Sequence, residues 1–241
     1  MPMIRLDKFL SDSGMVSRRE AKELLKAGRV ILNGSVCRAG DTKIDPGTAE
    51  VTADGKAVLA SGERYFLLNK PLGVITATED TSQKTVIDLL TPEQRRLGLF
   101  PVGRLDKDTT GLLLLTNDGD YAHRVISPKK QVYKVYIARV DAPLEEADIS
   151  RFAAGLALGD GTLCLPGKLD ILEPQLARVT ICEGKYHQVR RMLAACGKYV
   201  TELRRVSIGA LALPESLPEG QVIELSKAEA DKAFESSNSV I

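Results

Sequence analysis

Residues 103–119 read GRLDKDTTGLLLLTNDG and join a charged loop to an apolar strand. The loop carries two carboxylates, Asp106 and Asp108, and is bounded by Gly103 and Gly111. Four consecutive leucines follow, and a tight Asn-Asp-Gly turn closes the segment. A charged loop joined to a buried strand is how a rigid scaffold presents a reactive side chain. We therefore predict that the functional site is this loop and that the leucines form a core strand.

The segments around this loop predict an α+β domain on a mostly antiparallel mixed sheet. A strand begins near residue 64, and the other strand-like segments cover residues 132–140, 177–182, 201–208 and 222–225. Short helical patterns cover residues 120–127, 144–154 and 187–196. Because neither a regular strand–helix alternation nor a fixed-period repeat occurs, a parallel α/β fold is disfavoured. We assign this domain to residues 61–241.

The first sixty residues predict a separate small domain with two helices and a small sheet. Apolar residues at helical spacing cover residues 6–10. Ser17 and Glu20 form a capping-box pattern at the start of a second helix. The hairpin signal Asn33-Gly34 comes next. Residues 55–63, which are rich in turn signals, are expected to link this domain, residues 1–60, to the larger one.

Composition and charge narrow the choice of partners. The 241 residues carry a net charge of +1 and contain no apolar run long enough to span a membrane. The N-terminus has no signal-peptide core, and the four scattered cysteines predict buried thiols in a reducing compartment, so we expect a cytoplasmic protein. Residues 1–40 carry eight basic and four acidic side chains, and residues 183–205 carry six and two. Two basic blocks favour a polyanionic partner.

The second predicted helix carries a basic stripe. Arg18, Lys22, Lys26 and Arg29 follow one another at spacings of four, four and three residues, so they share one face. Most such stripes are simply solvated. This stripe contains no acidic residue and lies beside a predicted hairpin, which favours a nucleic-acid surface.

Two metal-dependent interpretations of the loop are set aside. The order Asp106, Asp108, Thr110 fits the Asp-x-Asp-x-Thr pattern of haloacid-dehalogenase-type phosphatases. That pattern follows a continuous apolar strand in a parallel fold, which is missing before residue 103. The same residues fit the first positions of an EF-hand, but Asn117 stands where a bidentate glutamate is required. Neither metal-dependent chemistry therefore fits the loop.

The N-terminal segments resemble the S4 RNA-binding domain. The resemblance rests on RLDKFL at residues 5–10, SRREA at 17–21, GRV at 28–30 and the Asn33-Gly34 turn. It implies contacts to RNA phosphates, which position the RNA without selecting its sequence. The implied RNA-binding residues are Arg5, Lys8, Arg18, Arg19, Lys22, Lys26 and Arg29.

The loop and its neighbours resemble the pseudouridine synthases, and more narrowly their RsuA branch. Residues 103–116 match the catalytic motif of that family. Further motifs occur in the family's order, namely LNKP at residues 68–71, EGKYHQVRRM at 183–192 and LRR at 203–205. Gln131 departs from the pattern, because relatives often carry lysine two places before the active-site tyrosine. The resemblance implies a cofactor-independent isomerase that acts on ribosomal RNA.

The resemblance also implies roles for individual residues. Asp106 is the reactive carboxylate, and Arg190 is its expected ion-pair partner. Tyr133 is expected to stack on the flipped uracil and to take up the C5 proton. Arg104 is a substrate-binding wedge or phosphate clamp, with an ion pair to Asp108 as the alternative. We expect His187 to be a hydrogen-bonding residue at a helix start, not a catalytic base.

The resemblance further implies a target. We expect uridine 516 of 16S rRNA, either in free rRNA or in a 30S assembly intermediate, to be modified by a monomeric protein. A 23S rRNA synthase of the same branch is the alternative. A non-catalytic ribosome-assembly factor with the same two basic surfaces is the rival from another class.

Overall fold

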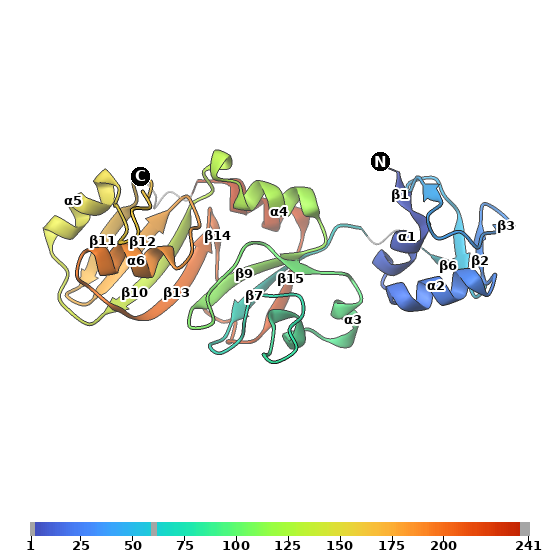
Figure 1. The fold of residues 1–241 in the computed structure, drawn as a ribbon, viewed down its shortest axis with the longest axis horizontal. Coiled ribbons are helices and arrows are strands. Elements are labelled where there is room, and N and C mark those ends of the chain that lie inside the picture. The colour runs from blue at the N-terminus through green and yellow to red at the C-terminus, as the bar shows by residue number, and fades with distance from the viewer. Residues whose placement is uncertain (1–2, 59–61, 237–241) are drawn as a thin grey trace. The chain divides into compact units, whose positions relative to one another are not determined.

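The computed structural model describes residues 3–58 and 62–236 and divides into two compact units (Figure 1). The first unit comprises residues 1–64 together with 90–99, and the second comprises residues 65–89 and 100–241. Among the described residues, no helix is long and apolar enough to cross a membrane.

The first unit contains the two predicted helices and a small antiparallel sheet. The helices are α1 (Leu6–Asp12) and α2 (Arg18–Lys26). The sheet has the order β3-β2-β5-β6, built from Ser35–Val36, Val30–Leu32, Val51–Ala53 and Lys56–Val58. A separate pair joins β1 (Ile4–Arg5) to β4 (Lys43–Ile44), and the short helix α3 (Pro92–Arg95) also belongs to this unit.

Local sequence signals account for this unit. Ser17 accepts a hydrogen bond from the Glu20 amide while the Glu20 carboxylate accepts from the Ser17 amide, which confirms the capping box. Asn33 and Gly34 both have positive φ (48° and 80°), as a tight hairpin turn requires. The predicted linker is partly wrong, because β6 occupies Lys56–Val58 and pairs with β5. Residues 59–61 of that segment lie outside the described residues.

The second unit is built on one curved, mixed sheet with the order β11-β12-β10-β13-β9-β7-β15. Short strands β8 (Phe100–Pro101) and β14 (Leu211–Ala212) pair with β9 and β13. Every pairing is antiparallel except that of β13 with β9, which confirms the predicted α+β class. The seven main strands, in sheet order, are Lys168–Glu173, Leu176–Ile181, Lys134–Val140, Val200–Ile208, Thr110–Thr116, Tyr65–Lys70 and Val222–Leu225.

The leucine strand β9 lies near the middle of this sheet, and all seven of its residues are buried. Helix α4 (Gly119–Ile126) packs Tyr121 and Val125 into the same apolar cluster as Leu112 and Leu114. The short helix α7 (Lys227–Asp231) and the 3-10 turn after it close this cluster with Ala230 and Ala233. The prediction that the leucines form a rigid core strand is confirmed.

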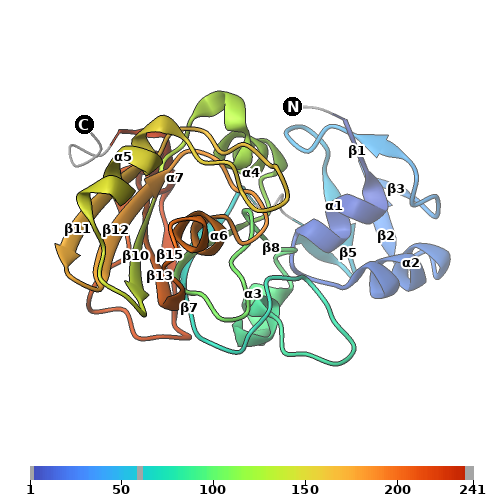
Figure 2. The same cartoon turned by 60° about the vertical axis from the view of Figure 1, so that its left-hand side comes forward.

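The helices α5 (Glu146–Ala154) and α6 (Gln188–Ala195) lie over the strands β11, β12, β10 and β13 (Figure 2). Helix α6 buries Val189, Met192 and Leu193, as its spacing predicts. Strand β11 was not predicted from the sequence. It is the edge strand, and only Leu169 is fully buried, so it lacks a clear two-residue alternation.

Candidate active site

The loop between β8 and β9 is clamped by hydrogen bonds on several sides. The Thr76 hydroxyl donates to the Leu105 carbonyl at 2.6 Å and accepts from the Leu105 amide at 3.1 Å. The Thr109 amide donates to the Asp106 carbonyl at 3.1 Å, which closes a four-residue turn. From the segment that follows β7, the Gly73 amide donates to the Lys107 carbonyl at 2.9 Å. The backbone that carries Asp106 is therefore held in one conformation.

Lys70 holds the loop from beneath and was not predicted as a site residue. Its side chain is fully buried, and Nζ donates to the carbonyls of Thr109 and Pro71 at 2.9 and 3.0 Å. The Lys107 carbonyl lies 3.5 Å from the same nitrogen. Burial lowers the pKa of Lys70 to about 8, against the attraction of Asp106 and Asp108. The sequence signals were its place at the end of a buried strand and in the LNKP motif of residues 68–71.

Arg190 contacts Asp108 and not Asp106, which corrects the predicted ion pair. Its Nη2 lies 3.0 Å from Asp108 Oδ2 and donates to the Asp108 carbonyl at 2.9 Å, while Nη1 donates to the Val200 carbonyl at 3.1 Å. Because the two carboxylates are only two residues apart, sequence spacing could not distinguish them. Arg190 thus ties helix α6 and the start of β13 to the loop.

Asp106 contacts His187 instead. Its Oδ1 lies 3.4 Å from His187 Nε2, and 28% of the aspartate side chain remains exposed. His187 precedes α6 in the left-handed conformation, at φ 48° and ψ 35°, and its side chain makes no capping hydrogen bond. The His187 side chain therefore contacts Asp106 and does not make the predicted hydrogen bond at the start of the helix. The strained backbone directs the imidazole toward the carboxylate.

Tyr133 and Tyr136 occupy different positions in the pairing of β10 with β13. Tyr133 precedes β10, and its carbonyl accepts from the Gly209 amide at 2.8 Å, at the end of β13 that lies farther from the loop. Tyr136 pairs with Arg205, and Arg205 pairs in turn with Gly111, where the loop enters β9. The Tyr136 hydroxyl lies 3.4 Å from Arg205 Nη1. The strand register thus sets Tyr136, which is 9% exposed, opposite Arg205, and sets the half-buried Tyr133 one residue before β10.

Comparisons with known proteins agree with this geometry. Residues 64–195 match the model of the RNA pseudouridylate synthase family, and residues 4–49 match the S4 domain. This chain belongs to the RNA pseudouridylate synthase family. The match confirms the predicted resemblance, and members of this family are isomerases.

Similar proteins cover nearly the whole synthase. The ribosomal small subunit pseudouridine synthase A of Yersinia pestis is 42% identical over 94% of this chain and 96% of its own length. An uncharacterized RNA pseudouridine synthase of Bacillus subtilis is 44% identical over the same shares of the two chains. A crystal structure of a pseudouridylate synthase matches with a TM-score of 0.68 and 36% identity over 95% of this chain and 99% of that one.

Arg104 of the synthase is exposed and precedes Asp106 by two residues. The alternative that it pairs with Asp108 is not what the structure shows, because Asp108 pairs with Arg190. No hydrogen bond or ion pair joins Arg104 to any other residue in the described parts of the chain. Its side chain is therefore available to a substrate at the mouth of the loop.

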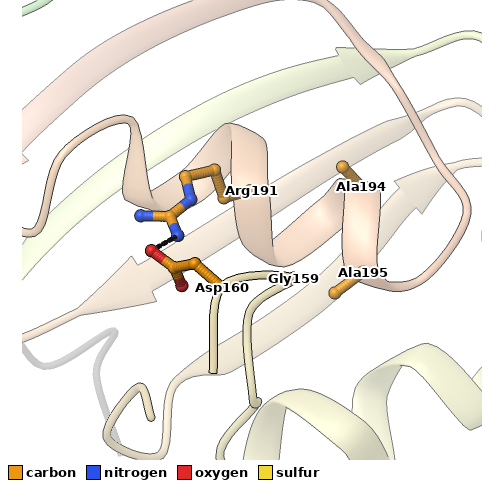
Figure 3. Close-up of a pocket in the computed structure, with 5 residues that line it drawn as sticks. All are labelled: Gly159, Asp160, Arg191, Ala194 and Ala195. Carbon is orange, nitrogen blue, oxygen red and sulfur yellow. Dashed lines mark ion pairs between the residues drawn. The ribbon is translucent and has the colours of Figure 1, made fainter. Parts of the chain in front are cut away.

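Arg191 contacts other partners than its neighbour Arg190. Its Nη2 lies 2.6 Å from Asp160 Oδ2, beside a cavity of about 320 Å³ that Gly159, Ala194 and Ala195 also line (Figure 3). Hydrogen bonds from Thr162, with Arg191, lower the pKa of Asp160 to about 2. This ion pair joins helix α6 to the loop that contains Asp160.

The predicted RNA-binding residues of the S4 unit divide into two sets. Acidic neighbours pair with four of them: Arg5 with Asp7 at 2.7 Å, Arg19 with Glu23 at 3.1 Å, Lys8 with Asp12, and Arg29 with Asp54. Arg18, Lys22 and Lys26 are exposed along α2 and form no ion pair with any residue that the structure describes. The unneutralised part of the stripe is thus these three residues.

Proposed function

We propose that this synthase converts one uridine of ribosomal RNA to pseudouridine, with Asp106 as the reactive carboxylate. In this proposal residues 1–60 hold the RNA and residues 61–241 carry out the reaction, as a monomer. The target that we propose is uridine 516 of 16S rRNA, in free rRNA or in a 30S assembly intermediate. The names of the Yersinia pestis relative and its homologues, which specify the small ribosomal subunit, support this choice over 23S rRNA.

The reaction is an isomerisation. The N1–C1′ bond breaks, the detached uracil turns, and a C5–C1′ bond forms, while C5 loses a proton and N1 gains one. Because atoms and electrons balance, the reaction requires no redox partner and no transferred group. It does require an ionised group next to the ribose or the base, and an extruded nucleotide that can reach it.

One observation carries the assignment of Asp106. Of the two carboxylates of the loop, the more exposed Asp108 is engaged by Arg190, whereas Asp106 is 28% exposed and lies against His187. Its backbone is fixed by Thr76, Gly73 and Lys70, which is the preorganisation that a reacting group needs. Asp106 is therefore held still and remains reachable.

The other site residues follow from this assignment. Arg190 keeps the loop in place through Asp108, and Arg104 binds the substrate RNA at the mouth of the loop. We propose that Tyr133 takes the aromatic role at the base, because its side chain is half-buried and can be reached. Tyr136 is 9% exposed, and its hydroxyl lies 3.4 Å from Arg205 Nη1.

The first test compares Asp106→Asn with Asp108→Asn. We expect Asp106→Asn to form no pseudouridine and to bind RNA as tightly as the wild type, because only the reacting group is changed. Asp108→Asn should lower the rate and keep measurable activity, because it weakens the contact to Arg190. Chemical mapping of pseudouridine in 16S and 23S rRNA, with filter binding in parallel, measures both. Full activity of Asp106→Asn excludes the proposal. If the unmutated protein itself binds rRNA and forms no pseudouridine, the result favours an assembly factor.

The second test separates the tyrosines. We expect Tyr133→Leu to lower the turnover number by at least about 100-fold, in the range expected when an acid–base group is lost, and Tyr136→Phe, which keeps the buried ring, to change it less than about threefold. Single-turnover pseudouridine formation at saturating RNA gives both values. The reverse order of the two defects would move the role to Tyr136.

A further inference from the structure

We propose that Tyr186 is a stacking platform for the nucleobase next to the extruded uridine. The inference rests on the proposed function, since it takes Asp106 as the reactive residue. It adds a binding residue that lies outside the loop, and it names the chemical class of the ligand: an unpaired base of the substrate RNA.

The first observation is the exposure of the Tyr186 ring. Tyr186 is 76% exposed, the most exposed of the large hydrophobic side chains in this unit. Its ring stacks on His187 with centroids 3.9 Å apart and an interplanar angle of 17°. One face of the tyrosine is therefore covered, and the ring presents flat apolar surface to solvent. Flat aromatic surfaces that stay exposed are how proteins bind unpaired bases.

The second observation is the position of this pair of rings. His187 Nε2 lies 3.4 Å from Asp106 Oδ1, and the face of the same imidazole stacks on the Tyr186 ring. One side chain thus connects the Tyr186 ring to Asp106, which places the ring close to a nucleotide whose ribose meets Asp106. A base on the free side of Tyr186 belongs to a neighbouring nucleotide.

The third observation is that the backbone around Tyr186 is fixed. Arg191 Nη1 donates to the Tyr186 carbonyl at 3.3 Å, and Arg191 is itself held by Asp160. On the other side, the Lys185 amide donates to Gln188 Oε1 at 2.8 Å, and Gln188 Nε2 donates to Glu183 at 2.6 Å. A ring that is exposed on a rigid backbone loses little conformational entropy when it binds.

A second exposed apolar side chain flanks the loop. Leu72 is 62% exposed in the turn whose Gly73 amide donates to the Lys107 carbonyl. The rim of the loop therefore carries apolar surface on two sides, from Leu72 and from Tyr186. This surface suits splayed bases better than phosphates.

The test is a double-mutant cycle between Tyr186 and the RNA. Binding is measured in the Asp106→Asn background, so that no turnover occurs, with a 16S rRNA fragment spanning uridine 516. The fragment is prepared intact, and with an abasic nucleotide at the 5′ or the 3′ neighbour of the uridine. We expect Tyr186→Ala to weaken binding of the intact fragment by about 5- to 100-fold. With one of the two abasic fragments, Tyr186→Ala should have no further effect.

Control variants exclude a purely structural role. Tyr186→Trp should bind like the parent, because it keeps a stacking ring. Tyr199→Ala should also bind like the parent, because Tyr199 is 64% exposed in the same unit but has no ring partner among the residues with described positions. In the Asp106 enzyme, Tyr186→Ala should raise KM and leave kcat within about threefold.

Several outcomes would overturn the inference. Unchanged binding by Tyr186→Ala, or effects that add fully with both abasic fragments, would show that no base stacks there. A fall in kcat equal to the rise in KM would mean that the tyrosine acts through His187 and Asp106. Failure of the proposed function is a separate result. In that case the protein with Asp106 intact would form no pseudouridine, and the binding cycle would still show whether a base stacks on Tyr186.

Discussion

At the scale of single residues, the buried lysines Lys70 and Lys134 differ in the contacts of their ammonium groups. Lys70 is buried, but its ammonium is bonded to loop carbonyls, so its charge contributes to holding Asp106 in place. The Lys134 side chain is 8% exposed and forms no hydrogen bond or ion pair with any residue of 3–58 or 62–236. Burial, and then the nearby Arg205, lower its pKa to about 8. One buried lysine is therefore bonded to protein oxygens and the other is not.

This difference predicts a pH-dependent stability for Lys134→Met. The unfolded chain keeps the proton of Lys134 up to its ordinary pKa of 10.5, and the folded chain releases it near 8. Between these values the unfolded state binds more protons, so the contribution of Lys134 to stability rises with pH. Below pH 8 the charged side chain costs roughly 3 kcal/mol. We expect Lys134→Met to be more stable than the wild type at pH 7, by about 1–3 kcal/mol, and equally stable near pH 10.5.

Urea unfolding at pH 7, 9 and 10.5 measures this difference, and comparison with the wild type at each pH cancels the parallel titration of Lys70. Lys168→Met is the matched control, because Lys168 is 41% exposed and lies 3.8 Å from Asp170. It should change stability by less than about 0.5 kcal/mol at every pH. A stability gap for Lys134→Met that is constant with pH would contradict the assignment.

At the scale of elements, the parallel pairing of β13 with β9 connects the loop to the rest of the site. Gly111 has φ +102°, and a Cβ there would lie 2.2 Å from the Arg205 carbonyl oxygen. Only glycine permits this close approach. Arg205 Nε then donates to the Leu112 carbonyl at 2.8 Å, while its other side faces Tyr136. Three strands are thereby brought together where the loop ends.

Helix α2 gives a prediction at the same scale. Arg18, Lys22 and Lys26 form no ion pair with any described residue, whereas Arg5, Lys8 and Arg19 are paired with acidic side chains. Changing the first three to glutamine should reduce the slope of log affinity against log salt by about two to three, because each phosphate contact contributes roughly 0.7–0.9. The turnover number at saturating RNA should stay within about twofold.

The triple change of Arg5, Lys8 and Arg19 to glutamine is the matched control, since it removes the same charge from the same unit. Its effect on the salt slope should be smaller, because these side chains are already neutralised by acidic neighbours. Titration of rRNA fragments at 50 to 300 mM salt measures both variants. Equal slopes for the two triple variants would show that the free stripe on α2 is not the RNA surface.

At the scale of the whole molecule, binding and chemistry are assigned to different units. The unpaired cations of the S4 unit lie on α2, and this unit has its own core, which includes Leu6, Phe9 and Leu25. The residues around Asp106 all come from the second unit, from segments separated by more than one hundred positions, such as Lys70 and Arg190. A substitution that removes charge from α2 therefore changes affinity and leaves the geometry of the loop intact.

The sequence alone determined the features that depend on neighbours along the chain. The capping box at Ser17, the turn at Asn33, the leucine strand and the buried stripe of α6 each follow from the spacing of side chains over one or two turns. The mostly antiparallel class also followed, because strand and helix signals did not alternate regularly. The loop stood out in the sequence because a charged segment met an apolar strand, and the resemblance to the pseudouridine synthases selected Asp106 within it.

Only the tertiary structure decided which distant side chains meet. It paired Arg190 with Asp108, placed His187 against Asp106, and set Tyr136 opposite Arg205. A shift of an ion pair by two residues leaves every local pattern unchanged. These choices are set by strand register and by the close approach at Gly111, which arise only when the sheet has assembled.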